Sequence, residues 1–140
     1  MTDTYPAQPP VKGGVVAYLS IDGAAKAAEF YTKAFGAEIA MMQPVDDKGR
    51  TMHAHIYLNG TSIMMSDFYP EHGHPVVPAA GFNLMILTNS IDADFKRAVE
   101  AGCTPVQPPE DMFWGDRYAR LKDPFGISWT MNQGQTSERA

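Results

Sequence analysis

Two short clusters in this chain carry side chains that can do chemistry. The first is His53-x-His55-x-Tyr57. Alternate residues of a strand share one face, so the two imidazoles and the phenol are expected side by side. Such a pair can chelate a metal, and an imidazole can act as a general base near neutral pH. No Asp or Glu beside them completes a metal site, which favours histidines that only hydrogen-bond within a cleft.

The second cluster is Trp114-Gly115-Asp116-Arg117-Tyr118. Its aromatic rings offer stacking surfaces, and the guanidinium offers two parallel hydrogen bonds to a carboxylate or another anion. Gly115 allows the backbone to turn sharply. A structural interpretation fits equally well, in which Arg117 pairs with Asp116 or another acid at a cleft rim and Trp114 lies in the core. Both interpretations stay open.

Other reactive side chains carry weaker signals. His72 and His74 lie in a proline-rich stretch and are expected to be solvated, with a role in a lid as the alternative. Cys103 follows the end of a predicted helix, where a buried, unreactive thiol is expected because no His or Lys is placed beside it. A single cysteine excludes an intrachain disulfide and fits a cytoplasmic setting.

Composition narrows the class of partner. The chain has 140 residues, enough for one compact domain, and a net charge of −5 with no basic stripe, which argues against nucleic acid. It has no apolar run of about 18 residues, so no membrane span is expected. The first residues lack the basic start and apolar stretch of a signal peptide. We therefore expect a cytoplasmic protein with no membrane partner.

The chain also repeats itself. Residues 60–66 read GTSIMMS and residues 126–132 read GISWTMN, a shared Gly-x-Ser-x-x-Met-polar register 66 residues apart. Gly36 and Gly102, each at the end of a helix pattern, have the same separation. A repeat of this length indicates two copies of one supersecondary unit. Two facing copies make a cleft, where a small protein binds a small molecule.

Each copy is predicted to be a βαβββ module. Module one spans about residues 14–68, with a helix capped by Asp22 that runs to about Phe35. Module two spans about residues 82–133, with a helix that starts at Ser90 or Asp92. Strands are expected near 15–21, 37–43, 51–58 and 61–67, and again near 82–88, 103–107, 116–121 and 127–132. Residues 69–81 form the linker, residues 1–13 a loosely held arm, and residues 134–140 a frayed tail.

Strand alternation assigns the faces. Met52, Ala54, Ile56 and Leu58 are expected to pack on the helix, which leaves His53, His55 and Tyr57 on the concave face of the sheet. By the same rule, Tyr18 and Thr130 lie opposite apolar neighbours on their own strands. Each strand thus offers a mixed polar face, which suits a ligand-lined cleft better than a plain core.

Short motifs follow one another along the chain: YLSIDG at 18–23, FY at 30–31, FG at 35–36, MHA at 52–54, MMSD at 64–67, WGDRY at 114–118 and DPFG at 123–126 with Trp129. Taken in this order, they resemble the vicinal oxygen chelate superfamily, which includes glyoxalase I, extradiol dioxygenases and bleomycin-resistance proteins. The likeness is greatest to its PhnB-like branch and covers about residues 15–132. The resemblance implies an α+β fold in which two tandem βαβββ modules form a cupped, mixed eight-stranded sheet with helices on the convex side, in a homodimer.

The resemblance also has a departure. Metal-using members place ligands on the first and last strands of each module, and these positions fall here on Val16, Met64, Asn83 and Thr130. Val has no donor atom, Met is a soft ligand, and Asn and Thr are weak neutral oxygens. A catalytic site needs about three firm ligands and an open position. We therefore expect no metal and no other cofactor.

The sequence thus predicts a protein that binds a small organic molecule in the concave cleft. Two enzymatic hypotheses stay open: a metal-dependent lyase, isomerase or dioxygenase that uses His53 and His55 in a rearranged site, and a metal-free enzyme with His53 as base and Arg117 holding a substrate anion. A third alternative is an interaction module whose cleft is filled by core side chains. The predicted ligand-binding residues are Tyr18, His53, His55, Tyr57, Trp114, Arg117 and Thr130.

Overall fold

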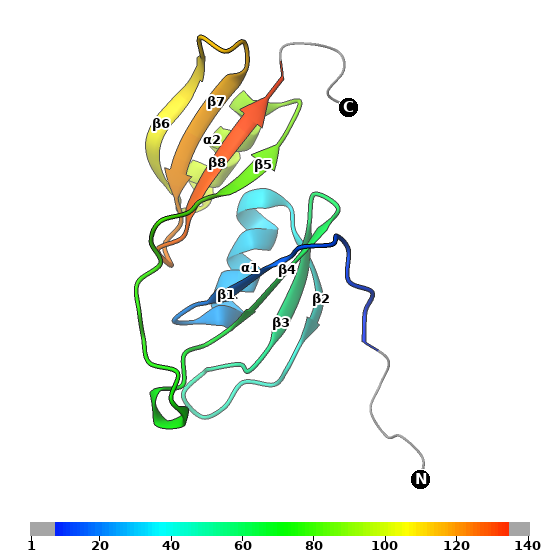
Figure 1. Cartoon of the computed structure of the whole chain (residues 1–140), viewed down its shortest axis with the longest axis vertical. Helices are drawn as coiled ribbons and strands as arrows, with labels where there is room; N and C mark the ends of the chain where they lie inside the picture. The colour runs from blue at the N-terminus through cyan, green and yellow to red at the C-terminus, as the bar shows by residue number, and fades with distance from the viewer. Residues whose placement is uncertain (1–7, 135–140) are drawn as a thin grey trace.

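A computed structural model of the chain describes residues 8–134. It contains the predicted βαβββ order twice (Figure 1). The predicted arm at 1–13 and tail at 134–140 lie partly outside the described residues. Module one holds β1 (Ala17–Ser20), α1 (Ala24–Phe35), β2 (Glu38–Met42), β3 (Ala54–Leu58) and β4 (Thr61–Ser66). A short 3₁₀ helix, η1 (Pro70–His72), follows. Module two holds β5 (Leu84–Leu87), α2 (Ile91–Ala101), β6 (Thr104–Asp111), β7 (Arg117–Lys122) and β8 (Ser128–Gln133).

Each module builds its own four-stranded sheet with the same topology. The strand orders are β1-β4-β3-β2 and β5-β8-β7-β6. The first and last strands of each module run parallel, and the other pairs are antiparallel. All eight predicted strands are confirmed. Within the described chain, however, they form two sheets and not one continuous sheet, because β1 and β5 pair only with the last strand of their own module.

The helices begin at caps supplied by the last strand of each module. The prediction that Asp22 caps the first helix is wrong: the N-cap is Gly23, at φ 99°, and no side chain of its own caps the turn. Instead Asp67, just after β4, accepts hydrogen bonds from the backbone N–H of Gly23 (2.7 Å) and Ala24 (3.2 Å). In module two, Gln133 Oε1 accepts the backbone N–H of Ile91 at 2.8 Å. These contacts satisfy N–H groups that a helix start leaves unpaired.

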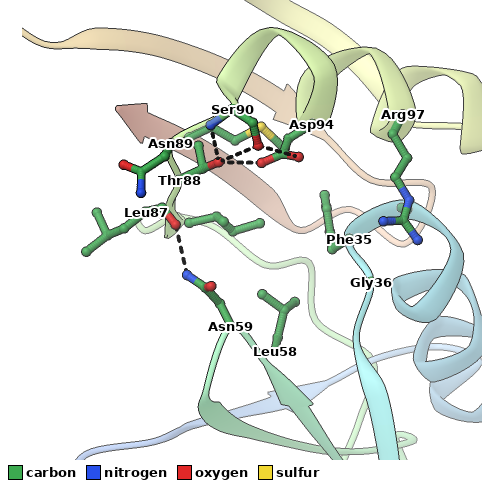
Figure 2. A pocket seen from close by; sticks show the side chains of 13 residues that line it. Phe35, Gly36, Leu58, Asn59, Leu87, Thr88, Asn89, Ser90, Asp94 and Arg97 are labelled. Atoms are coloured by element: carbon green, nitrogen blue, oxygen red, sulfur yellow. Dashed lines mark hydrogen bonds between the residues drawn. The ribbon is translucent and has the colours of Figure 1, made fainter. Parts of the chain in front are cut away.

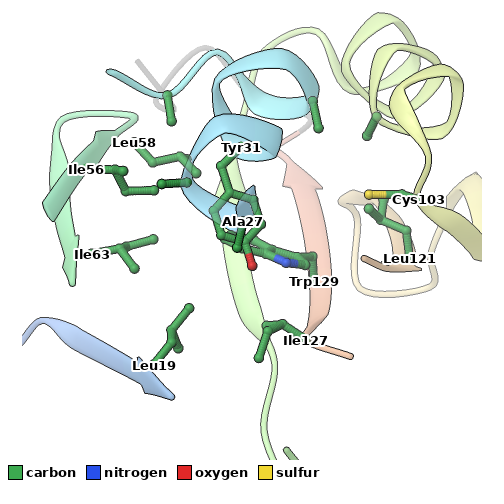
Figure 3. Close-up of a cluster of buried hydrophobic side chains, with 14 of the residues drawn as sticks. Leu19, Ala27, Tyr31, Ile56, Leu58, Ile63, Cys103, Leu121, Ile127 and Trp129 are labelled. Carbon is green, nitrogen blue, oxygen red and sulfur yellow. The ribbon is translucent and has the colours of Figure 1, made fainter. Parts of the chain in front are cut away.

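One apolar core serves both modules. Helix α1 covers one face of the module-one sheet, and its Tyr31 also reaches Trp129 on β8, with ring centroids 5.3 Å apart (Figure 3). The Phe35 ring lies 4.6 Å from that of Trp129. Helix α2 packs against α1 and covers the other sheet. The modules therefore share buried surface, which removes apolar area from water on both sides of the junction. The buried core includes Leu19, Ile56, Ile63, Met65, Ile91, Leu121, Ile127 and Met131.

A buried carboxylate fixes the same junction. Asp123 accepts hydrogen bonds from Tyr31 Oη (2.6 Å) and Trp129 Nε1 (2.9 Å), and from the backbone N–H of Phe125 and Ile127 in its own turn. Burial, reinforced by the charge of Asp123, raises the pKa of the Tyr31 phenol. The predicted turn at 123–126 is confirmed, and it also links module two to helix α1 of module one.

We expect Tyr31→Phe to destabilise the protein by about 1–3 kcal/mol, because a buried carboxylate loses one of its donors while the ring packing is kept. Urea unfolding followed by circular dichroism measures the change. The matched control is Tyr118→Phe, since the Tyr118 hydroxyl has no hydrogen-bond partner in residues 8–134. Equal stabilities of the two variants would mean that the Tyr31–Asp123 bond contributes nothing to the junction.

Candidate functional site

The face of the module-one sheet opposite α1 carries a row of polar side chains. Leu19 on β1 and Ile63 on β4 point toward the helix and are buried. Their strand neighbours point the other way, and Tyr18 is 53% exposed there. We call this surface the open face of module one. It is the face on which the alternation pattern placed the candidate ligand-binding residues.

Tyr18 and His53 form a hydrogen-bonded pair on this face. Tyr18 Oη lies 2.9 Å from His53 Nδ1, and the two ring centroids are 5.7 Å apart. The side chains reach each other across β4, which separates β1 from β3 in the sheet. When Nδ1 carries the proton and donates to Tyr18 Oη, the Nε2 atom of His53 keeps a lone pair that can accept a proton or a ligand hydrogen bond.

A second pair lies beside the first. Ser20 Oγ is 3.1 Å from His74 Nε2, and the His74 ring lies 5.3 Å from that of Phe68. The prediction that His74 is a solvated loop residue is therefore wrong. The sequence signal for its placement is Pro70 followed by Gly73: Pro70 starts η1, and Gly73, at φ 78°, ends it and turns the chain back. The backbone of His74 then pairs with that of Tyr69 in an isolated β-bridge.

His55 and Tyr57 lie on the same face but already have partners. His55 is 2% exposed, and its Nε2 is 2.7 Å from Ser62 Oγ. Burial, with a smaller contribution from His53, lowers the pKa of His55. Tyr57 Oη donates to the carbonyl oxygen of Pro10 at 2.7 Å. The two histidines thus bond to different neighbours and do not converge on one point.

The N-terminal arm is attached to this sheet. The backbone N–H of Lys12 donates to Ser62 Oγ, and the backbone N–H of Ser62 donates to the carbonyl oxygen of Lys12. Lys12 Nζ lies 4.0 Å from the centre of the Tyr57 ring. For its described part, residues 8–13, the prediction of a loosely held arm is therefore wrong, because β4 and Tyr57 supply hydrogen-bond partners to its backbone.

The module-two candidates separate from one another. Arg117 points to the α2 side of its sheet, where its guanidinium bonds to Asp92 (2.9 Å) and Asp111 (3.2 Å). Arg117 therefore pairs with acids of its own module, as the structural interpretation of this cluster predicted, but its partners are Asp92 and Asp111 and not Asp116. Trp114 is 49% exposed in the turn after β6, so it is not a core residue. Thr130 is buried on the opposite side of the sheet from Arg117.

The positions that hold metal in related proteins do not fit a metal here. The Val16 side chain has no donor atom for a metal. Thr130 Oγ1 donates to Asn83 Oδ1 at 3.0 Å, so the Thr130 and Asn83 side chains bond to each other. Within residues 8–134, no group of three or more His, Cys, Asp or Glu side chains is arranged to hold a metal ion. Cys103 is buried, as predicted, and burial raises the pKa of its thiol to about 12.

A large cavity lies elsewhere, at the junction of the modules. It has a volume of about 610 Å³ and is lined by the end of α1, the β3–β4 turn, the end of β5 and the start of α2 (Figure 2). None of the seven predicted ligand-binding residues lines it. No local pattern of the sequence predicts this cavity, because it forms only where segments distant in the chain meet.

The polar groups around this cavity bond to one another. Asn59 Nδ2 donates to the carbonyl oxygen of Leu87 at 2.9 Å, and both Thr88 and Ser90 donate to the Asp94 carboxylate (Figure 2). Arg97 Nε donates to the carbonyl oxygen of Lys33 at the end of α1. The bonds from Asn59 and Arg97 join the two modules, and the bonds to Asp94 hold the start of α2 within module two. Because these hydrogen-bonding groups already have partners, the junction cavity has a structural role.

A charged cluster holds the linker against module one. Arg50 bonds to Asp46 at 2.9 Å and to Glu71 of η1 at 2.7 Å, and its guanidinium lies 4.5 Å from the centre of the Tyr69 ring. The hydrogen bonds from Arg50 lower the pKa of Glu71 to about 2. Through η1, this cluster positions the segment that carries His74.

Comparisons with known proteins place the chain in a family. The pattern of the Glyoxalase/Bleomycin resistance protein/Dioxygenase superfamily matches residues 15–131. The chain belongs to this superfamily. An uncharacterized protein of Mycobacterium bovis is 37% identical over 122 residues, which cover 83% of this chain and 80% of that protein.

Solved structures agree with the assignment. TioX from Micromonospora sp. ML1 superposes with a TM-score of 0.69 at 25% identity, covering 86% of this chain and 98% of TioX. A PhnB protein from Bacillus cereus has the same fold, with a TM-score of 0.66 at 21% identity over 87% of this chain and 100% of that chain. These matches confirm the resemblance. No helix in residues 8–134 is long and apolar enough to span a bilayer.

We expect Glu71→Gln to make the protein less sensitive to acid. The pKa of Glu71 in the folded state is depressed from 4.5 to about 2, so its stabilising contribution is complete above about pH 4.5 and is lost as the pH falls toward about 2. Unfolding midpoints of both proteins across this range measure the effect. Asp47→Asn is the control, because it removes a neighbouring acid that takes no part in the ion pairs of Arg50. An unchanged acid profile in Glu71→Gln would contradict the role given to Glu71.

Proposed function

We propose that this protein binds a small organic molecule on the open face of module one, centred on Tyr18 and His53. The hydrogen-bonded Tyr18–His53 pair carries the proposal, because it lies on a sheet face that no helix covers. Because Tyr18 is half exposed, the pair is not part of the apolar core. It presents an aromatic surface and a fixed hydrogen-bonding group to a ligand.

The surroundings of the pair support a ligand of mixed polarity. Ser20 and His74 add a second hydrogen-bonded pair, and Ser66 lies beside Ser20 in the strand register. Met64, opposite Tyr18 on β4, supplies a flexible apolar surface that adapts to different shapes. We propose that binding here needs no resident metal or other cofactor, in agreement with the poor donor set at the family's ligand positions. The buried Cys103 thiol is consistent with a cytoplasmic location.

A metal-free enzyme is the second candidate, and one observation favours it. The hydrogen bond between His53 Nδ1 and Tyr18 Oη fixes the orientation of the His53 ring, as a general base requires. In the tautomer that leaves Nε2 unprotonated, His53 accepts a proton from a ligand bound on the open face. Arg117 takes no part in this proposal, because its guanidinium is held by Asp92 and Asp111.

A thermal-shift screen first identifies ligands. We expect His53→Ala to weaken their binding by about tenfold or more, and Tyr18→Phe by about threefold to tenfold, because each substitution removes hydrogen-bonding atoms from the open face. Calorimetric titration measures both changes. His72→Ala is the matched control, since His72 is an exposed linker histidine. Unchanged affinity in both variants would refute the site. Turnover that is lost in His53→Ala while binding persists would favour the enzyme.

Metal content is measured on the same samples after incubation with Ni²⁺, Zn²⁺, Mn²⁺ and Fe²⁺ and desalting. Occupancy near zero supports the metal-free proposal. One ion per chain in the wild type, absent from His53→Ala or His55→Ala, contradicts it and makes a metal-dependent lyase, isomerase or dioxygenase the working hypothesis.

We also propose that the protein is a homodimer in which the partner covers the first strand of module two. On β5, Met85 and Leu87 point away from the helices and are 51% and 48% exposed. This strand is also the edge of its sheet, which leaves backbone groups unpaired. A second copy that covers it removes both apolar side chains and an open edge from water.

We expect the wild type to sediment as a dimer at micromolar concentration and Leu87→Asp to sediment as a monomer, because a charge on the apolar edge opposes its burial. Analytical ultracentrifugation distinguishes the two states. Met52→Asp places the same charge on an exposed apolar residue in the loop before β3 and serves as the control. A monomeric wild type, or a dimeric Leu87→Asp, rules out this interface.

A further inference from the structure

One arginine in the described chain has no partner. The side chains of Arg50, Arg97 and Arg117 are each held by carboxylates or by helix-end carbonyl groups. Arg120 makes no hydrogen bond or ion pair within residues 8–134. It alternates along β7 with Ala119 and Leu121, which are buried against α2, so it points to the opposite, open face of module two.

Arg120 lies in a hollow on that face with a volume of about 330 Å³. The hollow is formed by the segment before β5 together with β6, β7 and β8. In the strand register, Arg120 lies opposite Thr130, and Lys122 lies opposite Ser128. The side chains that define the hollow are Phe82, Asn83, Val106, Arg120, Ser128 and Thr130.

The hollow offers donors that have no acceptor. Asn83 uses its Oδ1 atom to accept the Thr130 hydroxyl, which leaves the two N–H bonds of its Nδ2 atom available. Ser128 makes no side-chain hydrogen bond in the described residues. With Arg120, three neighbouring groups can donate toward the hollow. This contrasts with the junction cavity, where the polar groups already bond to each other.

The charge around these donors indicates which kind of ligand they can bind. No acidic residue lines the hollow, although the whole chain carries a net charge of −5. The nearest acid on β6 is Glu110, which lies opposite Tyr118 and accepts a hydrogen bond from Gln107. A guanidinium beside an amide and a hydroxyl binds a carboxylate through paired, charge-assisted hydrogen bonds. Phe82 and Val106, both about half exposed, supply apolar walls.

We propose that this hollow is a binding subsite for an organic carboxylate with an apolar or aromatic body, and that Arg120 holds its carboxylate group. The inference rests on the proposed function in that it assigns a ligand class to the open faces of the sheets. It uses module two alone and does not require the Tyr18–His53 pair. Thr130 enters the subsite by orienting the Asn83 amide.

The test uses sodium benzoate as the probe and benzamide as its uncharged counterpart. Both are titrated into the full-length protein at low salt and followed by ¹H–¹⁵N NMR. Benzoate is expected to shift the Asn83 side-chain amide and the backbone signals of Gly81 and Thr130, and to bind at least about tenfold more tightly than benzamide, because the charge of Arg120 is used only by benzoate. Added salt is expected to weaken the binding of benzoate alone.

Substitutions assign the effect to Arg120. Arg120→Gln is expected to lower benzoate affinity about tenfold or more, and Arg120→Lys to restore part of it, because lysine keeps the charge but not the paired donors. Lys122→Gln removes an equal charge from the same face of the same strand and is expected to leave affinity within about twofold. Absence of benzoate shifts in the wild type, or equal losses in Arg120→Gln and Lys122→Gln, overturns the proposal.

The outcome is independent of the site on module one. His53→Ala is expected to bind benzoate as the wild type does. If it does while ligand binding at the Tyr18–His53 pair is disproved, the carboxylate subsite stands without the proposed function. If His53→Ala loses the benzoate shifts at Asn83, the probe binds on module one and the assignment to Arg120 is wrong.

Discussion

The hydrogen bond between Tyr31 and the buried carboxylate of Asp123 is the contact on which the arrangement of the two modules depends. A carboxylate removed from water is costly unless its lone pairs are satisfied, and here the donors come from three different places. Two are backbone groups of its own turn, one is Trp129 on β8, and one is the Tyr31 phenol of α1. All can be supplied together only if α1 lies at one position relative to β8. The positions of the two open faces follow from that position.

Polar side chains on the open faces are hydrogen-bonded in pairs that join different segments of the chain. Tyr18 with His53 and Ser20 with His74 do this on module one. Thr130 bonds to Asn83, and Asn132 bonds to Asp116, on module two. Such pairs satisfy groups that no helix covers and fix their orientation before a ligand arrives, which lowers the entropic cost of binding. Arg120 differs from this pattern, and that difference makes it informative.

The repeat predicted the fold well because it encodes local structure: strand alternation, the glycine after each helix and the turn at 123–126 are all short-range features. The pairing of Tyr18 with the face of His53 and His55 followed from the same alternation. The errors concern contacts between distant segments. The position of Asp22 just before the helix favours it as the cap. The sheet, however, brings Asp67 to the start of the helix, where it accepts the backbone N–H groups of Gly23 and Ala24. Strand alternation places Arg117 and Arg120 on opposite faces of β7. Only the packing of that strand shows that the face of Arg117 is the one that meets α2. The placement of His74 and the junction cavity likewise depend on long-range packing.

Two of the contacts that cross the junction come from equivalent positions of the repeat. Tyr31 in α1 and Arg97 in α2 are 66 residues apart, and each reaches into the other module. The first is a phenol that bonds to a carboxylate, and the second is a guanidinium that bonds to helix-end carbonyl groups. The two modules are therefore not interchangeable, and making them identical would require changes on both sides of the junction at once.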